Sequence, residues 1–106
     1  MDRPYRYAHE KFAAAVHALA TGAGDARARV HSAWLEFHTV APSHLPEELR
    51  SDLEWILEKI TEKPARNRLR SSIRTSLEDM QNSTAQQLAK RILRIEKRLR
   101  YLDSPL

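Results

Sequence analysis

The chain has 106 residues and a formal net charge of +4, with 42% hydrophobic and 30% charged residues. This length allows one domain with one hydrophobic core, and the apolar content excludes a disordered tail. Because the sequence has no cysteine, disulfides, cysteine-ligated zinc, iron–sulfur clusters and thiol nucleophiles are excluded as well.

The first two helices are predicted at residues 4–20 and 26–38. Apolar side chains recur in both at intervals of three or four residues, which predicts one buried stripe on each helix. Between them, Gly22 or Gly24 can end a helix in the left-handed conformation, and Asp25 can cap the next one. Such a short connection makes the two helices antiparallel neighbours.

Three further helices are predicted at about residues 46–62, 71–80 and 84–102, whereas the basic segment 65–70 is ambiguous. Prolines mark the boundaries of the first of these helices, with acidic residues favoured in its first turn by the helix dipole. We therefore expect an all-α fold, a four- to five-helix bundle built mainly from antiparallel neighbours, in a single domain over residues 1–106.

The last predicted helix has the most regular apolar pattern in the chain. Ser83 and Gln86 have the spacing of a capping box, which predicts a new helix start at this point. The stripe that follows consists of Ala85, Leu88, Ile92, Ile95, Leu99 and Leu102. Its alternating steps of three and four residues are typical of a helix packed lengthwise against others.

The segments LATGAGDARARV and LPEELRSDLEWI resemble a group of short uncharacterised bacterial helical proteins with a LATGxGD turn. The similarity covers residues 12–62 best and the final helix more weakly. It implies a bacterial or phage source and a helical fold. It carries over no activity and no functional residue.

No pattern in the sequence predicts a catalytic centre, a cofactor site or a metal site. The five histidines have neither the i, i+4 spacing of converging ligands nor an HExxH motif, so we expect them to border the core. The glycines at 22 and 24 follow a predicted helix rather than a strand, and Asp25 would repel a phosphate. The carboxylates of the third helix lie off its apolar stripe. We therefore expect a protein that is not an enzyme.

Charge is distributed unevenly along the chain. Residues 1–62 carry seven Lys or Arg and ten Asp or Glu, whereas residues 63–106 carry eleven and four. These halves can attract each other within the fold or across a dimer. The candidate interaction surface combines a tryptophan outside the stripe of its helix with a basic row on the last helix: Trp55, Lys90, Arg91, Arg94, Lys97 and Arg98. Trp55 can be an interface anchor or can cover the edge of the bundle.

Two classes of function fit this surface. The first is a non-catalytic protein–protein interaction module or small regulatory partner, which we expect to form a homodimer through the last helix. The alternative is a nucleic-acid-associated accessory protein, in which the basic last helix neutralises phosphates. Because the opening residues lack the apolar core of a signal peptide and no apolar run spans a bilayer, we expect a cytoplasmic protein without a membrane partner.

Overall fold

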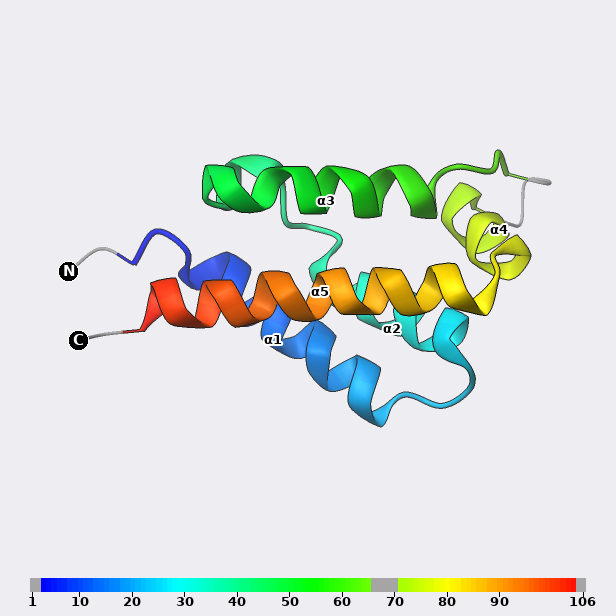
Figure 1. The fold of residues 1–106 in the computed structure, drawn as a ribbon, viewed down its shortest axis with the longest axis horizontal. Helices are drawn as coiled ribbons and strands as arrows, with labels where there is room; N and C mark the ends of the chain where they lie inside the picture. Colours follow the sequence, from blue (N-terminus) through cyan, green and yellow to red (C-terminus); the bar gives the residue numbers. More distant parts are fainter. Residues whose placement is uncertain (1–2, 66–70, 105–106) are drawn as a thin grey trace.

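The chain begins with two helices joined by a tight turn. In the computed structural model, which describes residues 3–65 and 71–104, α1 spans Arg6–Thr21 and α2 spans Ala26–Phe37 (Figure 1). Gly24 takes the left-handed conformation with a φ of 93°. The Asp25 carboxylate then accepts a hydrogen bond from the backbone N–H of Ala28 at 3.1 Å. The predicted cap at Asp25 is therefore confirmed, and the turn brings α2 back along α1.

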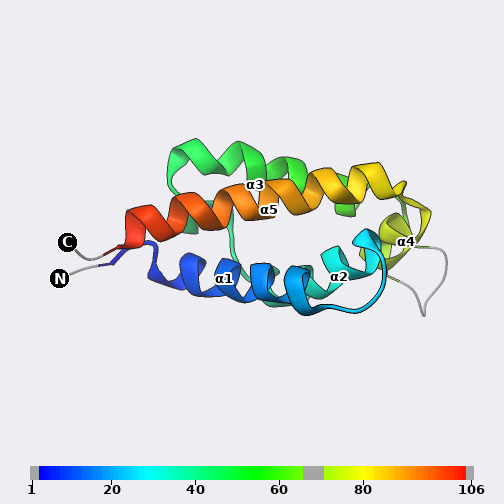
Figure 2. The ribbon, with the colours of Figure 1, turned by 60° about the horizontal axis from the view of Figure 1, so that its bottom comes forward.

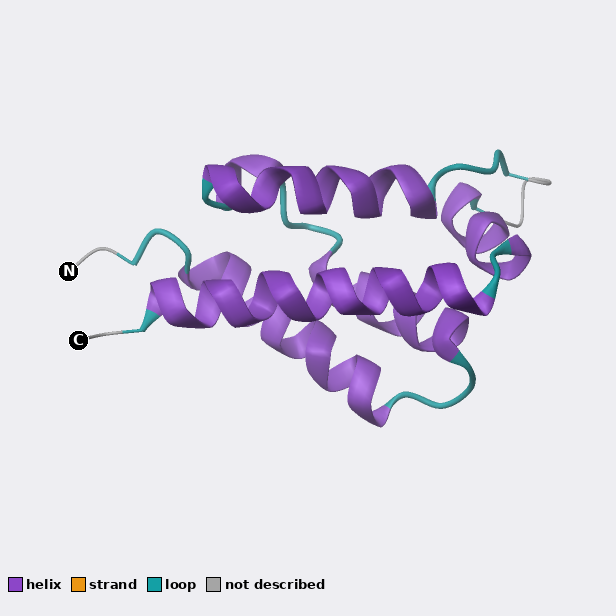
Figure 3. Ribbon diagram, in the orientation of Figure 1, coloured by secondary structure: helices purple, strands orange, loops and turns teal. Residues whose placement is uncertain are grey.

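The rest of the described chain is helical too. The remaining elements are the short 3-10 helix η1 (Pro42–His44), α3 (Glu47–Ile60), α4 (Ser72–Asp79) and α5 (Asn82–Asp103). Residues 3–65 and 71–104 contain no strand (Figure 3). The prediction of an all-α bundle is confirmed, with five α-helices in this part of the chain.

The last helix holds the bundle together. It contacts α1, α2 and α3, and it runs antiparallel to α1 and α3 (Figures 1 and 2). Its apolar stripe is fully buried at Ala85, Leu88, Ile92, Ile95 and Leu99. Burial of this stripe within one chain supplies much of the apolar surface that drives folding.

Aromatic side chains join α1 to α2. The rings of Phe12 and Phe37 stack with their centroids 4.7 Å apart, and both side chains are buried. Trp34 meets Phe37 edge-on at 5.3 Å. Both arrangements suit the charge distribution of aromatic rings.

The predicted start of the last helix is wrong by two residues. It begins at Asn82, and Gln81 occupies the cap position without a side-chain cap. The capping box at Ser83 and Gln86 is not formed, because both residues lie inside the helix, whose first turn is closed by the bond from the N–H of Thr84 to the Gln81 carbonyl at 3.1 Å. Gln81 has an extended conformation and the helix begins at the next residue, one position before Ser83.

Most of the other predicted helix boundaries shift by one or two residues. The third helix ends at Ile60 instead of residue 62, because Thr61 leaves the helical conformation and its hydroxyl donates to the Leu57 carbonyl at 2.6 Å. Most of the ambiguous basic segment, residues 66–70, lies outside the described residues.

In the part of the chain that is described, no helix combines the length and the apolar composition needed to cross a bilayer.

Candidate interaction surface on the last helix

A buried carboxylate joins one side of α5 to α3. The side chain of Asp52 is 5% exposed, and one of its oxygens accepts a hydrogen bond from Nη1 of Arg91 at 3.0 Å. Nε of Arg94 lies 3.6 Å from the other carboxylate oxygen. Because a buried charge without partners is costly, these two arginines are needed where they lie. The acidic and basic helices therefore pair within one chain at this position.

Trp55 lies on the same side of α5. Its half-buried ring packs against the core, and the Arg91 guanidinium lies over it, 4.3 Å from the ring centroid. The Lys59 ammonium is 5.8 Å from the same centroid. Cations favour this position over the electron-rich face of an indole. The structure thus uses Trp55 to join α3 to α5.

Arg98 extends the contact with α3 by two further turns. Its Nε donates to the Glu48 carboxylate at 2.9 Å, and its guanidinium lies 5.1 Å from the centroid of Tyr101. Three members of the basic row predicted from the sequence, Arg91, Arg94 and Arg98, therefore have acidic partners on α3.

The two lysines of the row behave differently. Lys90 and Lys97 are exposed, and within residues 3–65 and 71–104 neither has a carboxylate partner. They are seven residues apart, which places them on one face of the helix about 10.5 Å apart along its axis. The predicted basic row is therefore divided into three paired arginines and two free lysines.

Two large apolar side chains accompany the free lysines on the outward side of α5. Leu93 is 47% exposed and Tyr101 is 71% exposed. Leu93 and Lys90 line two adjoining grooves. One groove, of about 420 Å³, lies between α5 and the α1–α2 pair, and the other, of about 590 Å³, lies toward α3. We call this set, Lys90, Leu93, Lys97 and Tyr101, the outward face of α5.

Leu93 and Tyr101 were missed by the sequence reasoning, although a signal was present. Both are apolar residues outside the regular stripe of the last helix, the same criterion that singled out Trp55 on the third helix. An apolar residue outside the stripe of its own helix is a candidate for a binding surface, and Leu93 is such a residue in the middle of the basic row.

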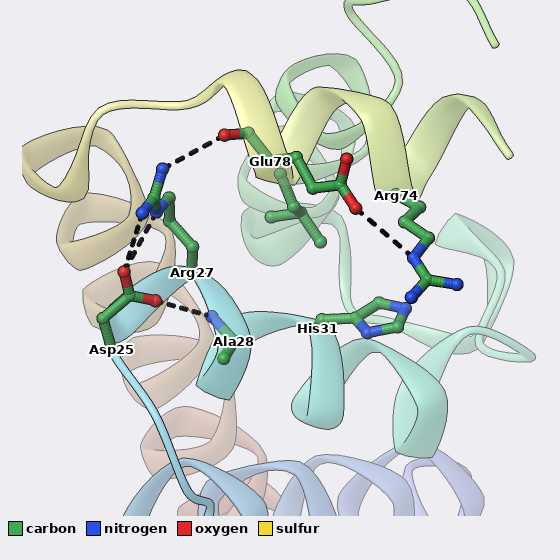
Figure 4. Close-up of a pocket in the computed structure, with 7 residues that line it drawn as sticks. Asp25, Arg27, Ala28, His31, Arg74 and Glu78 are labelled. Carbon is green, nitrogen blue, oxygen red and sulfur yellow. Dashed lines mark hydrogen bonds and ion pairs between the residues drawn. The ribbon is translucent and has the colours of Figure 1, made fainter. Parts of the chain in front are cut away.

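A separate pocket, of about 260 Å³, lies between α2 and α4 (Figure 4). Arg27 crosses it, donating to the Asp25 carboxylate at 2.9 Å and to the backbone carbonyl of Glu78 at 3.1 Å. A cation at the end of α4 satisfies carbonyls that the helix leaves without partners. The N–H of Ala28 and, after it, Arg27 hold the pKa of Asp25 below its usual value.

The opposite wall of this pocket carries another ion pair. Nε of Arg74 lies 3.4 Å from the Glu78 carboxylate, and the His31 ring lies beside Arg74 (Figure 4). Both arginines of the pocket are thus engaged by oxygen atoms of the chain itself. This favours a structural role, in which the start of α2 is fastened to the end of α4.

A further polar cluster connects the two ends of the described chain. The Asp103 carboxylate is 2% exposed and accepts hydrogen bonds from Nε and Nη2 of Arg3 at 3.0 and 2.7 Å. Nδ1 of His9 lies 3.0 Å from the same carboxylate. The bonds from Arg3 first, and then His9, hold the pKa of Asp103 below its usual value. These contacts offset the unfavourable position of a carboxylate at the C-terminus of a helix.

The histidines are dispersed over the bundle. Nδ1 of His38 contacts the Leu35 carbonyl at 2.9 Å, and Nδ1 of His44 accepts the N–H of Ala41 at 2.9 Å. Among the residues that the structure describes, no three His, Asp or Glu side chains form a group suited to a metal ion.

Comparison with known proteins gives no relative from which a function could be transferred. No family model matches the chain, and no curated protein and no solved structure is significantly similar to it.

Proposed function

We propose that this chain is a non-catalytic helical interaction module that binds another protein through the outward face of α5. The observation that supports this most directly is Leu93. It is 47% exposed on the ridge between two adjoining grooves, and Lys90 lines both of them. An apolar side chain between grooves, with charge at its rim, has the composition of a protein-binding surface.

The nucleic-acid alternative rests on the same helix but on fewer side chains. Three of the five basic residues are neutralised by carboxylates of α3, and Glu48 itself lines the groove on that side. The phosphates of a nucleic acid would contact the ammonium groups of Lys90 and Lys97, whereas the apolar side chain of Leu93 offers them no favourable interaction. Nucleic-acid binding would be recognised by a strong salt dependence, with a slope of about −0.9 per neutralised phosphate of duplex DNA.

Self-association is the other alternative. The apolar stripe of α5 is buried within one chain, so the outward face is what α5 has left to offer a second copy. That face carries two free lysines in each copy, which repel each other. We therefore propose a different protein as the partner. A monomer of 12.3 kDa in sedimentation equilibrium at micromolar concentration agrees with this, whereas a dimer lost in Leu93→Glu supports self-association.

The proposed function is tested by site-specific photo-crosslinking in the host cell. A photoreactive amino acid is placed at position 93, and position 35 serves as the control. Leu35 on α2 is 58% exposed and lies outside both grooves. We expect a protein adduct from position 93 and none from position 35. A nuclease-sensitive adduct would favour the alternative, and equal labelling from both positions would contradict the proposal.

A further inference from the structure

We infer that the partner presents an acidic amphipathic helix, which lies along α5 with its apolar side chains in the groove between α5 and the α1–α2 pair. This inference rests on the proposed function and adds the chemistry of the partner. It follows from the juxtaposition of an apolar groove with two free lysines on one ridge.

The lining of this groove is mostly apolar. Its apolar residues come from three helices and are Val16, Leu19, Ala20, Ala26, Ala89 and Leu93. Three of the six are alanines, which allow the backbone of a docked helix to approach closely. The volume of about 420 Å³ gives room for aliphatic side chains that enter from above.

The charges around the groove favour a partner with negatively charged side chains. Among the described residues that line it, the charged ones are Arg29 and Lys90, both positive. Arg29 is engaged, because its guanidinium donates to the carbonyls of Gly24 and Leu19 at 3.0 and 3.4 Å. Lys90 and, two turns on, Lys97 are free. Carboxylates on the partner would therefore find unpaired cations, and a basic partner would be repelled.

The spacing of these groups fits a helix better than a strand. Lys90 and Lys97 are separated by two helical turns, about 10.5 Å, with Leu93 between them. A helix packed at a small angle repeats every seven residues, so two carboxylates seven apart meet both lysines. On a strand, about 10 Å corresponds to three residues, which point to opposite faces. The expected pattern is two acidic residues seven apart with a large apolar residue between them.

A second copy of this chain does not offer that pattern. Its acidic helix, α3, has carboxylates on the surface, but its stripe of Leu49, Leu53, Ile56 and Ile60 is buried. It would present charge without the apolar side chains that the groove accepts. The partner is therefore a different protein.

A peptide-display selection tests this inference. A library of random 16-residue peptides is selected against the whole chain, and the selected peptides are measured by fluorescence anisotropy. We expect them to carry Asp or Glu seven residues apart around a large apolar residue, and to lose binding when a central proline prevents helix formation. Binding should weaken more than about tenfold in Leu93→Glu and about tenfold in the Lys90→Glu, Lys97→Glu double variant.

Matched controls separate this surface from the general properties of the protein. Leu35→Glu introduces the same charge at an exposed leucine of α2, and Lys63→Glu reverses an exposed lysine after α3. Both should leave affinity unchanged within about twofold. Circular dichroism establishes that each variant is folded before its affinity is interpreted.

The outcomes distinguish the two levels of the proposal. Peptides that depend on Leu93 but are neutral, basic or tolerant of proline would overturn the acidic helix and leave the interaction module standing. Peptides that bind Leu93→Glu as well as the parent chain would overturn both. A selection without enrichment over background also counts against both.

Discussion

The basic side chains on the two sides of α5 differ in whether they have carboxylate partners. Toward α3, Arg91, Arg94 and Arg98 are paired with carboxylates, and Arg91 also covers Trp55. Toward α1 and α2, the helix meets an apolar groove, and Lys90 stands at its edge without a described carboxylate partner. α5 therefore packs against helices on both sides, but its arginines are paired on the side toward α3, whereas Lys90 stays unpaired at the edge of the groove on the other side. Basic residues of similar spacing acquire different roles from the helix that they face.

The largest expected effect is a loss of stability when the buried stripe of α5 is truncated. It is compared with the same change at the adjacent residue on the outward face. Ile92→Ala should lower the free energy of unfolding by about 2–4 kcal/mol, because it removes a fully buried side chain. Leu93→Ala should change it by less than about 0.5 kcal/mol. Urea denaturation measures both. Similar losses for the two variants would mean that Leu93 belongs to the core.

A second prediction concerns the side that faces α3. Asp52→Ala should cost about 1–3 kcal/mol, because Arg91 and Arg94 lose the carboxylate that they share. Glu48→Ala removes an exposed ion pair with Arg98 and should cost about 0–1 kcal/mol. If the two variants are equally stable, the burial of Asp52 does not strengthen its ion pairs with Arg91 and Arg94.

A third prediction uses pH to test the ion pair at the end of α5. The pKa of Asp103 lies below its usual value in the folded chain, because Arg3 and then His9 bond to the ionised form. The carboxylate therefore adds stability above its unfolded pKa of about 3.9, and this contribution is lost as the pH falls through the lower folded value. We expect Asp103→Asn to be less stable than the parent chain at pH 7.

The control for this prediction is the same comparison at low pH. Below about pH 3.9 the difference between the two chains should shrink as the pH falls, since the unfolded parent chain takes up a proton that the folded carboxylate binds only at a lower pH. Urea denaturation across this range measures it. A difference that stays constant with pH would show that Asp103 acts through packing rather than through its charge.

The smallest expected effect lies on the open side of α5. Lys97→Ala should change the free energy of unfolding by less than about 0.5 kcal/mol, because its ammonium has no carboxylate partner in the described chain. Thermal denaturation in low and high salt measures it. A loss comparable to that of Asp52→Ala would remove the distinction between the two sides.

Most of the fold could be predicted from the sequence, because helix periodicity and cap chemistry are local. The stripe from Ala85 to Leu99 is buried as its spacing indicates, and Asp25 caps α2 as predicted. The start of α5 was placed two residues too late, because the spacing of Ser83 and Gln86 predicted a cap there, whereas the backbone becomes helical directly after Gln81. Ser83 therefore lies inside the helix, where its hydroxyl contacts the Gln81 side chain at 3.5 Å, and its spacing from Gln86 does not reveal that the backbone has already become helical.

The candidate surface was predicted less well, for a physical reason. Sequence spacing shows that Lys90, Arg94 and Arg98 share a face, but not which neighbouring helix that face meets. The approach of α3 pairs Arg94 with Asp52 and Arg98 with Glu48, and leaves Lys90 free. Trp55 likewise gained a partner on another helix, Arg91. Pairing between distant helices is decided by three-dimensional packing.

The bonds between Arg3 and Asp103 also have a mechanical consequence. They lie where the two ends of the described chain come together, beside the antiparallel α1 and α5 (Figures 1 and 2). A force that pulls the ends apart therefore acts on this ion pair first and then peels α1 from α5 one turn at a time. Such peeling breaks contacts in sequence, so the bundle yields to tension more easily than it would if the helices had to slide past each other.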